Sequence, residues 1–303
     1  MSFMADHLIN EARRRQVRLW VDVDGELRFT AGDGAAHDRL FHLLRSQAGQ
    51  IAARITAGGA SWFKSLSTAT ADAPLVYVIP AAGASPSTYR AWGEFGHGRL
   101  RVEAVLTPGR EERFQEGPFT NIAPLADRLT EQILGHADRP FAVFGHSYGA
   151  LVAREVTRRL ARSTDQQLAL FVAGSPPPDQ VSPGAGSESD DELLSMLHGW
   201  QGTPPELLED PDFLRLFLPA LRADLKVYSS ARADLDPSQP VPVPLVALAG
   251  RQDDTAALDQ FLIWQAWTTK DYSAHVVEGG HFFPVTAASE VVDIVVRTLL
   301  VNR

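Results

Sequence analysis

The sequence predicts an α/β protein with a parallel central sheet, preceded by a small module of helix, hairpin and helix. Three observations lead to this prediction. Apolar runs of strand length alternate with amphipathic helical patterns over most of the chain. A Gly-x-Ser-x-Gly stretch lies between one such run and a helical pattern. The first 60 residues differ in charge from the rest and end in small, Gly-rich residues.

The composition is that of an ordinary globular chain. Of 303 residues, 45% are hydrophobic and 21% charged, and no stretch reaches the roughly 18 unbroken apolar residues of a membrane span. The net charge of -9 opposes nucleic acid or an anionic membrane surface as the main partner. The lack of cysteine excludes disulfides, thiolate zinc sites and a Cys nucleophile. The first residues lack the order of a signal peptide, so we expect a cytoplasmic location.

The N-terminal module begins with a helical pattern over residues 8–12. Apolar and polar residues then alternate from Val17 to Phe29, on both sides of Asp24-Gly25. This dipeptide favours a tight hairpin, because both central positions of the turn need a positive φ. A second helix is expected over residues 38–55, which have one apolar face.

A change in charge marks the end of this module. Residues 1–60 carry eight Arg and no Lys against seven acids, whereas 20 basic and 30 acidic residues follow. Residues 57–60 are small and Gly-rich, which is typical of a linker. We therefore predict a first domain over residues 1–56 and a second over residues 61–303.

The run from Ala12 to Phe29 resembles the TubC-type N-terminal docking domains of nonribosomal peptide and polyketide synthetases. The resemblance covers residues 1 to about 56. It implies that the module captures a C-terminal segment of an upstream synthetase protein, which a free edge of the hairpin could accept as a third strand. The alternative is a cap that binds nothing and packs on the larger domain.

The larger module alternates strand and helix patterns. The expected strands are Val76–Ile79, Val102–Leu106, Phe141–Phe144, Leu168–Val172, Leu245–Leu248 and His275–Val277. The expected helices are Thr88–Phe95, Ile122–Leu134, Ala150–Leu160, Thr255–Trp267 and a last one from Val291 to Leu299. Residues 187–232 contain helical patterns without a strand and are interpreted as a lid. The alternation predicts a parallel sheet with helices on both faces.

The stretch Gly145-His146-Ser147-Tyr148-Gly149 follows one of these strands and precedes a helix. A strand that turns sharply into a helix holds the serine in a strained conformation, and the two glycines permit the turn and the close approach of helix and strand. The start of the helix supplies backbone N–H groups where an oxyanion would form. We therefore predict Ser147 as a nucleophile.

A serine hydroxyl needs a base, and the base needs an orienting acid. Among nine histidines we favour His281, which follows the last predicted strand at the sheet edge of the serine. His146 is expected to pack or hydrogen-bond, because the turn directs adjacent side chains apart. For the acid we favour Asp253 after an earlier strand, with Asp254 and Asp179 as rivals. The chain order Ser, Asp, His is that of α/β-hydrolases.

Several further stretches form a family pattern. They are Ile79–Ser85 with Tyr89 and Trp92, Pro108–Arg113, Gly145–Ala150, Gly202–Pro205, Pro219–Asp224 and Gly280–Phe283. Together they resemble the stand-alone type II thioesterases of polyketide and nonribosomal peptide assembly lines, over residues 61 to about 300. Two positions depart from that family: Tyr148 replaces the common Met, and Ser175-Pro176-Pro177-Pro178 replaces a basic stretch. These departures affect the expected acyl chamber and substrate size.

This resemblance implies an α/β-hydrolase fold with a mostly parallel sheet and a helical lid. It implies hydrolysis of acyl or aminoacyl thioesters on the phosphopantetheine arm of a carrier protein, without a cofactor. Carried over by position, Ser147 is the nucleophile, His281 the base and Asp253 its orienting partner, while the backbone N–H groups of Ala82 and Tyr148 bind the oxyanion. The alternatives are a cyclase or acyltransferase that uses the same residues, and a catalytically idle docking scaffold.

Overall fold

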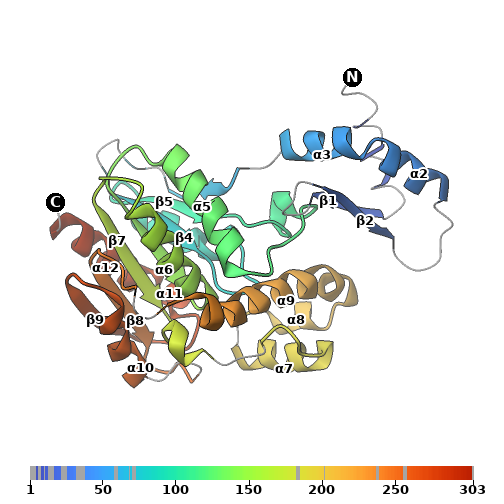
Figure 1. Ribbon diagram of the computed structural model, residues 1–303. Coiled ribbons are helices and arrows are strands. Elements are labelled where there is room, and N and C mark those ends of the chain that lie inside the picture. The colour runs from blue at the N-terminus through green and yellow to red at the C-terminus, as the bar shows by residue number, and fades with distance from the viewer. Residues whose placement is uncertain are drawn as a thin grey trace. The chain divides into compact units, whose positions relative to one another are not determined.

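The computed structural model describes residues 5, 8–9, 11–12, 17–21, 26–31, 38–57, 61–67, 69, 73–181, 185–200, 202–236, 239–254 and 258–301 (Figure 1). The chain divides into two compact units, Met1–Ser61 with Leu106–Phe119, and Trp62–Val105 with Thr120–Arg303. The predicted turn at Asp24-Gly25 and residues 58–60 of the predicted linker lie outside the described residues.

The N-terminal unit contains two strands and two α-helices with described bounds, and residues 8–9 and 11–12 are helical, as predicted. The strands and α-helices are β1 Val17–Val21, β2 Leu27–Ala31, α2 Asp38–Ser46 and α3 Ala48–Ala57. The strands pair antiparallel, with Leu19 opposite Phe29. Leu19 and Leu44 are fully buried in a small apolar core, because one face of β1 and one face of α2 are apolar. A turn at Gln47 divides the helix predicted over residues 38–55 into α2 and α3.

Within the described residues, the larger unit contains a seven-stranded sheet of order β3-β5-β4-β6-β7-β8-β9. Its strands are β3 Phe63–Ser65, β4 Leu75–Ile79, β5 Arg101–Val105, β6 Phe141–His146, β7 Leu168–Ala173, β8 Leu245–Gly250 and β9 Tyr272–Val277. β3 pairs antiparallel with β5, and all other neighbours pair parallel. The six predicted strands are therefore confirmed, whereas β3 is an additional strand at the edge.

Helices cover both faces of this sheet (Figure 1). They include α4 Arg90–Gly96, α5 Ile122–His136, α6 Tyr148–Leu160, α11 Phe283–Thr286 and α12 Ala288–Val301. Val78 of β4 packs with Trp92 of α4 and Val291 of α12. Its neighbour Tyr77 points to the opposite face, where its hydroxyl lies 2.8 Å from Nδ1 of His136 in α5. Successive strand residues thus contact different helical layers.

The segment between β7 and β8 is helical, as predicted for residues 187–232. It contains α7 Asp190–Trp200, α8 Pro205–Leu208 and α9 Pro211–Asp234. The carboxylate of Asp210 caps α9 by accepting the N–H of Asp212 at 2.9 Å. In the helix predicted over residues 255–267, α10 Leu258–Ile263 is α-helical and Trp264–Trp267 form a 3₁₀-helix, whereas residues 255–257 lie outside the described residues.

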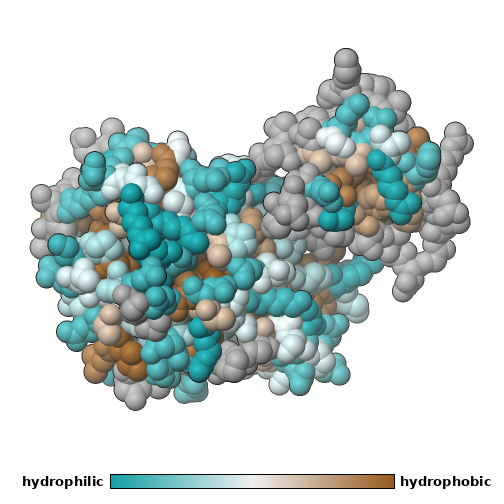
Figure 2. All heavy atoms as spheres, in the orientation of Figure 1, coloured by the Kyte–Doolittle hydropathy of each residue, from teal (hydrophilic) through white to brown (hydrophobic). Residues whose placement is uncertain are grey.

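The visible surface is mostly hydrophilic, with hydrophobic residues in small separate areas (Figure 2). No helix in the described part of the chain is long and apolar enough to cross a membrane. The functionally important feature is the edge formed by the carboxyl ends of β4, β6, β8 and β9, because the loops that follow them carry the predicted site residues.

Candidate active site

Ser147 lies at the turn between β6 and α6. Its φ of +57° and ψ of -125° belong to a region that residues with a side chain rarely occupy. The flanking glycines make the turn possible: a Cβ at Gly145 would overlap the carbonyl oxygen of Gly149, and a Cβ at Gly149 would lie 2.5 Å from that of Pro80. The turn holds the hydroxyl of Ser147 at the carboxyl edge of the sheet.

Two loops bring an imidazole and a carboxylate to this serine. Nε2 of His281, in the loop after β9, lies 3.0 Å from Oγ of Ser147. Nδ1 of the same ring lies 3.0 Å from Oδ2 of Asp253, in the loop after β8. Because a carboxylate accepts hydrogen bonds, Nδ1 carries the ring proton and Nε2 presents a lone pair to the hydroxyl. This arrangement can remove the proton of Ser147 as its oxygen attacks an acyl carbon.

The structure separates Asp253 from the two rival acids. The side chain of Asp253 is 0% exposed and that of His281 is 9% exposed, so their contact is shielded from water. Asp254 is exposed. Asp179 lies in the 3₁₀-helix Pro178–Gln180, where its carboxylate accepts the side-chain amide of Gln180 at 3.1 Å. Of the three acids, Asp253 alone contacts His281 in the described part of the chain.

The loop after β4 is anchored on both sides of Ala82. The N–H of Ala81 donates to Oη of Tyr89 at 3.1 Å, and the N–H of Gly83 donates to Oδ2 of Asp224 at 2.8 Å. Asp224 belongs to α9 and is buried. Tyr148, the second predicted donor, is the first residue of α6, where the N–H groups of a helix point outward. The predicted oxyanion donors therefore come from a fixed loop and a helix N-terminus.

Aromatic side chains lie around these loops. Gly83 has a φ of +72°, and a Cβ at this position would lie 2.7 Å from the ring of Phe217 in α9. The ring of Trp200, at the end of α7, lies 6.4 Å from that of His281. A Cβ at Gly202 would overlap the ring of Phe282. The helical segment between β7 and β8 thus contributes apolar walls beside both the β4 loop and the histidine.

Comparison with known proteins places the larger unit in a family. The model of the thioesterase domain matches residues 74–299. The chain belongs to the thioesterase family. This thioesterase is 29% identical over 243 residues to the gramicidin S biosynthesis protein GrsT of Aneurinibacillus migulanus, a match that covers 78% of this chain and 93% of GrsT. Residues 1–73 lie outside the range of the family match.

Another relative and a solved structure match this chain over most of their own length. The thioesterase PikA5 of Streptomyces venezuelae is 31% identical over 251 residues, which are 80% of this chain and 86% of PikA5. The solved structure of the type II thioesterase BorB from the borrelidin biosynthetic cluster matches with a TM-score of 0.71 and 30% identity. That match covers 78% of this chain and 98% of BorB. The larger unit of the thioesterase therefore has the fold of solved thioesterases.

His146 of the thioesterase is a buried hydrogen-bonding residue, which agrees with the expectation from its place beside Ser147. Its Nδ1 lies 2.7 Å from Oη of Tyr89, and its Nε2 lies 2.8 Å from the carbonyl oxygen of His281. Burial is the main cause that lowers the pKa of His146 from 6.5 to about 3, and the nearby His281 acts in the same direction. His146 is therefore neutral at physiological pH.

Three features of the thioesterase site were not assigned from the sequence. Tyr89 and Asp224 lie in family-like stretches, but no local pattern indicates that their oxygens anchor the loop around Ala82. Trp200 is the last residue of the lid helix α7, and no sequence pattern indicates that its ring lies beside that of His281. Among the described residues, no group of three or more His, Asp and Glu side chains could hold a metal ion.

Proposed function

We propose that this thioesterase hydrolyses acyl or aminoacyl thioesters on the phosphopantetheine arm of a carrier protein in a nonribosomal peptide or polyketide pathway. The family membership supports thioester cleavage. The relatives include proteins of gramicidin S and anguibactin biosynthesis and the type II thioesterases BorB and YbtT, which supports such a pathway. The main observation behind the reaction type is the pair of 3.0 Å contacts that join Ser147, His281 and Asp253.

In the proposed mechanism, Oγ of Ser147 attacks the thioester carbonyl while Nε2 of His281 takes the hydroxyl proton. Asp253 holds the ring in the required tautomer and stabilises its positive charge. The N–H groups of Ala82 and Tyr148 stabilise the negative oxygen of the tetrahedral intermediate. Collapse of this intermediate breaks the carbon–sulfur bond, and the proton on Nε2 passes to the sulfur. A water, deprotonated by the same nitrogen, then releases the acid and restores Ser147.

Intact-protein mass spectrometry of an acyl-loaded carrier protein tests this function. We expect the wild type to remove the acyl mass and to leave free phosphopantetheine and the acid, and Ser147→Ala to remove none. The matched control is Ser163→Ala, because Ser163 lies just beyond the other end of α6 and its hydroxyl donates to the carbonyl of Arg159. Substantial hydrolysis by Ser147→Ala would refute its assignment as nucleophile.

The same experiment separates the alternatives. A cyclic or amine-captured product would indicate a cyclase or acyltransferase, since the acyl-enzyme would then react with a nucleophile other than water. No release across several acyl groups would favour an idle scaffold. The close contacts between Ser147, His281 and Asp253 are evidence against an idle scaffold.

We further propose that residues 1–56 dock a C-terminal segment of an upstream synthetase protein. The β1–β2 sheet has two strands in the described residues, so each strand has one edge without a strand partner in this sheet. Deletion of residues 1–56 should weaken binding to one synthetase protein of the pathway, measured by biolayer interferometry. It should leave hydrolysis of a small acyl thioester unchanged. Equal binding with and without this segment would contradict docking.

A further inference from the structure

A chain of three hydrogen bonds, two of them buried and the third partly buried, joins the loops around Ser147. The N–H of Ala81 donates to Oη of Tyr89, this oxygen lies 2.7 Å from Nδ1 of His146, and Nε2 of His146 lies 2.8 Å from the carbonyl oxygen of His281. Tyr89 and His146 are both 0% exposed. The chain thus runs from the β4 loop, through the residue before Ser147, to the loop of the histidine.

The groups at its two ends determine the direction of the two end bonds, and the neutral state of His146 determines that of the middle bond. A backbone N–H only donates, and a backbone carbonyl only accepts. Nε2 of His146 therefore carries a proton, which it donates to the carbonyl of His281. Nδ1 of a neutral His146 keeps its lone pair and accepts the hydroxyl proton of Tyr89. A charged His146 would direct a second N–H at Tyr89, which would reverse this bond and leave the hydroxyl proton of Tyr89 without its acceptor.

The neutral state of His146 also matters to the reacting histidine. The two ring centres lie 5.2 Å apart. His281 becomes positively charged when it takes the proton of Ser147, and a second positive imidazole at this distance would oppose that step. Burial keeps the pKa of His146 far below physiological pH, so the repulsion is avoided.

We propose that His146 is a positioning residue, which holds the loop of His281 and the loop of Ala82 in a fixed relation to Ser147. The inference rests on the proposed function, because it assigns the base to one loop and an oxyanion donor to the other. The backbone of His146 is joined directly to Ser147. Through His146, the loop of the base His281, the nucleophile Ser147 and the loop of the oxyanion donor Ala82 are therefore connected. Loss of either bond of the ring should loosen one loop while every reacting group stays in the protein.

Two amide variants separate the two bonds of the ring. In His146→Gln, the side-chain NH₂ group takes the place of Nε2, so the donor to His281 remains and the acceptor for Tyr89 is lost. In His146→Asn, the side-chain oxygen takes the place of Nδ1, so the acceptor remains and the donor is lost. Tyr89→Phe removes the hydroxyl and keeps the ring, which packs edge-on against Trp92.

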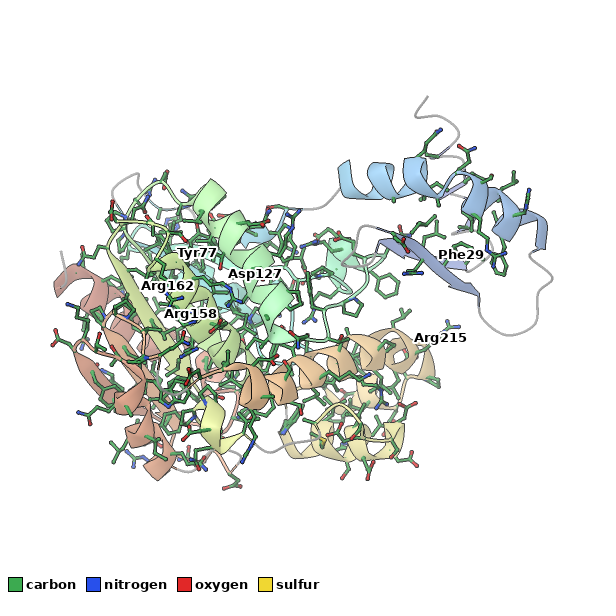
Figure 3. All side chains as sticks on the ribbon, in the orientation of Figure 1. Phe29, Tyr77, Asp127, Arg158, Arg162 and Arg215 are labelled. Atoms are coloured by element: carbon green, nitrogen blue, oxygen red, sulfur yellow. The ribbon has the colours of Figure 1, made fainter. Side chains whose placement is uncertain are left out.

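The chain offers a matched control in Tyr77→Phe. Tyr77, which is labelled in Figure 3, is also 0% exposed. Its hydroxyl lies 2.8 Å from Nδ1 of a histidine, His136 at the end of α5. This pair has the same chemistry as Tyr89 and His146, but it joins β4 to α5 and no loop of the site. Tyr77→Phe therefore shows the effect of losing a partly buried Tyr–His bond that holds no loop of the site.

Two rates are measured for each variant. The first is kcat with a short-chain acyl N-acetylcysteamine thioester, per active site titrated with a fluorophosphonate. The second is the rate at which the fluorophosphonate attaches to Ser147, which depends on base and oxyanion donors but needs no thioester. A wild type that is labelled but cleaves no thioester would refute the proposed function alone, and the labelling rates would still test the positioning role.

We expect the variants of Tyr89 and His146 to lower both rates about 10- to 100-fold, with KM unchanged within about twofold. Tyr77→Phe should leave both rates unchanged. Tyr89→Phe and His146→Gln break the same bond, so the double variant should be no slower than the slower single variant. Rates like those of Tyr77→Phe, or additive losses, would overturn the proposal. Tyr89→Phe also removes the acceptor of the Ala81 N–H, so if the His146 variants do not fold, the tautomer of His146 measured by NMR decides whether its two bonds are made as proposed.

NMR of protein with isotope-labelled histidine gives a second test that involves no kinetics. At pH 7 we expect the proton of His146 on Nε2 and that of His281 on Nδ1, which are opposite tautomers. The Nδ1–H tautomer or a charged ring for His146 would overturn the proposal.

Discussion

Replacement of His146 by Gln should make the stability of the protein less dependent on pH. Burial lowers the pKa of His146 from 6.5 to about 3 in the folded protein, because the charged form is withdrawn from water. Between these two values the unfolded chain binds one more proton than the folded protein. The contribution of His146 to the free energy of unfolding is therefore fully present above pH 6.5, and it is lost progressively as the pH falls towards 3.

The magnitude follows from the same two pKa values. Where the unfolded imidazole is charged and the folded one is neutral, the free energy of unfolding falls by about 1.4 kcal/mol per pH unit. From pH 7 to pH 5, the loss caused by His146 amounts to about 2 kcal/mol, or roughly 30-fold in the unfolding equilibrium constant. His146→Gln removes the titrating group, so it should lose about 2 kcal/mol less over this interval.

Urea unfolding at the two pH values, followed by tryptophan fluorescence, measures this difference. The larger unit provides the signal through the buried Trp92, Trp264 and Trp267. The control is His275→Gln, because His275 is a half-buried histidine on the edge strand β9. A pH-dependent loss in His146→Gln that equals the wild-type loss within about 0.5 kcal/mol would refute the reasoning.

Two further predictions concern the site and its turn. Asp253→Asn should lower kcat by about 10³-fold or more, because an amide can donate to Nδ1 of the histidine and select the wrong tautomer. Asp254→Asn should retain activity in the same carrier-protein assay, and an equal loss in both would contradict the choice of acid. Gly149→Ala should cost about 3 kcal/mol in urea unfolding, since its Cβ would overlap the carbonyl of Ile79. Gly135→Ala, where nothing lies within 4 Å of the new Cβ, should cost nothing.

Local patterns account for the parts of the fold that the sequence predicted well. Four of the parallel strands, β4, β6, β7 and β8, are buried along their whole length and are almost entirely apolar, which is a local signal. β5 and β9 include polar residues, but each contains a shorter apolar stretch. β3 has only three residues, which is too short for a recognisable alternation, and its pairing with β5 depends on a neighbour distant in sequence. The turn at Gln47 between α2 and α3 has no Pro or Gly at that position to mark it.

The contacts within the site lie beyond such patterns. Ser147 could be placed at a strained turn because the glycines on both sides carry the signal locally. Asp253 and Asp254 are adjacent and chemically identical, so only the packed loops show that Asp253 meets His281. The bonds of Tyr89 with His146 and of Gly83 with Asp224 join residues 57 and 141 positions apart.

The sequence alone thus determined the class of fold, the order of its strands along the chain and the residue types that can perform acyl transfer. These properties follow from hydrophobic periodicity, turn chemistry and side-chain reactivity, each of which acts over a few residues. Only the tertiary structure decided which acid meets the histidine and how His146 is bonded. The physical reason is that a hydrogen bond between distant segments forms only where packing brings both groups together. The residues of either segment alone do not indicate where that is.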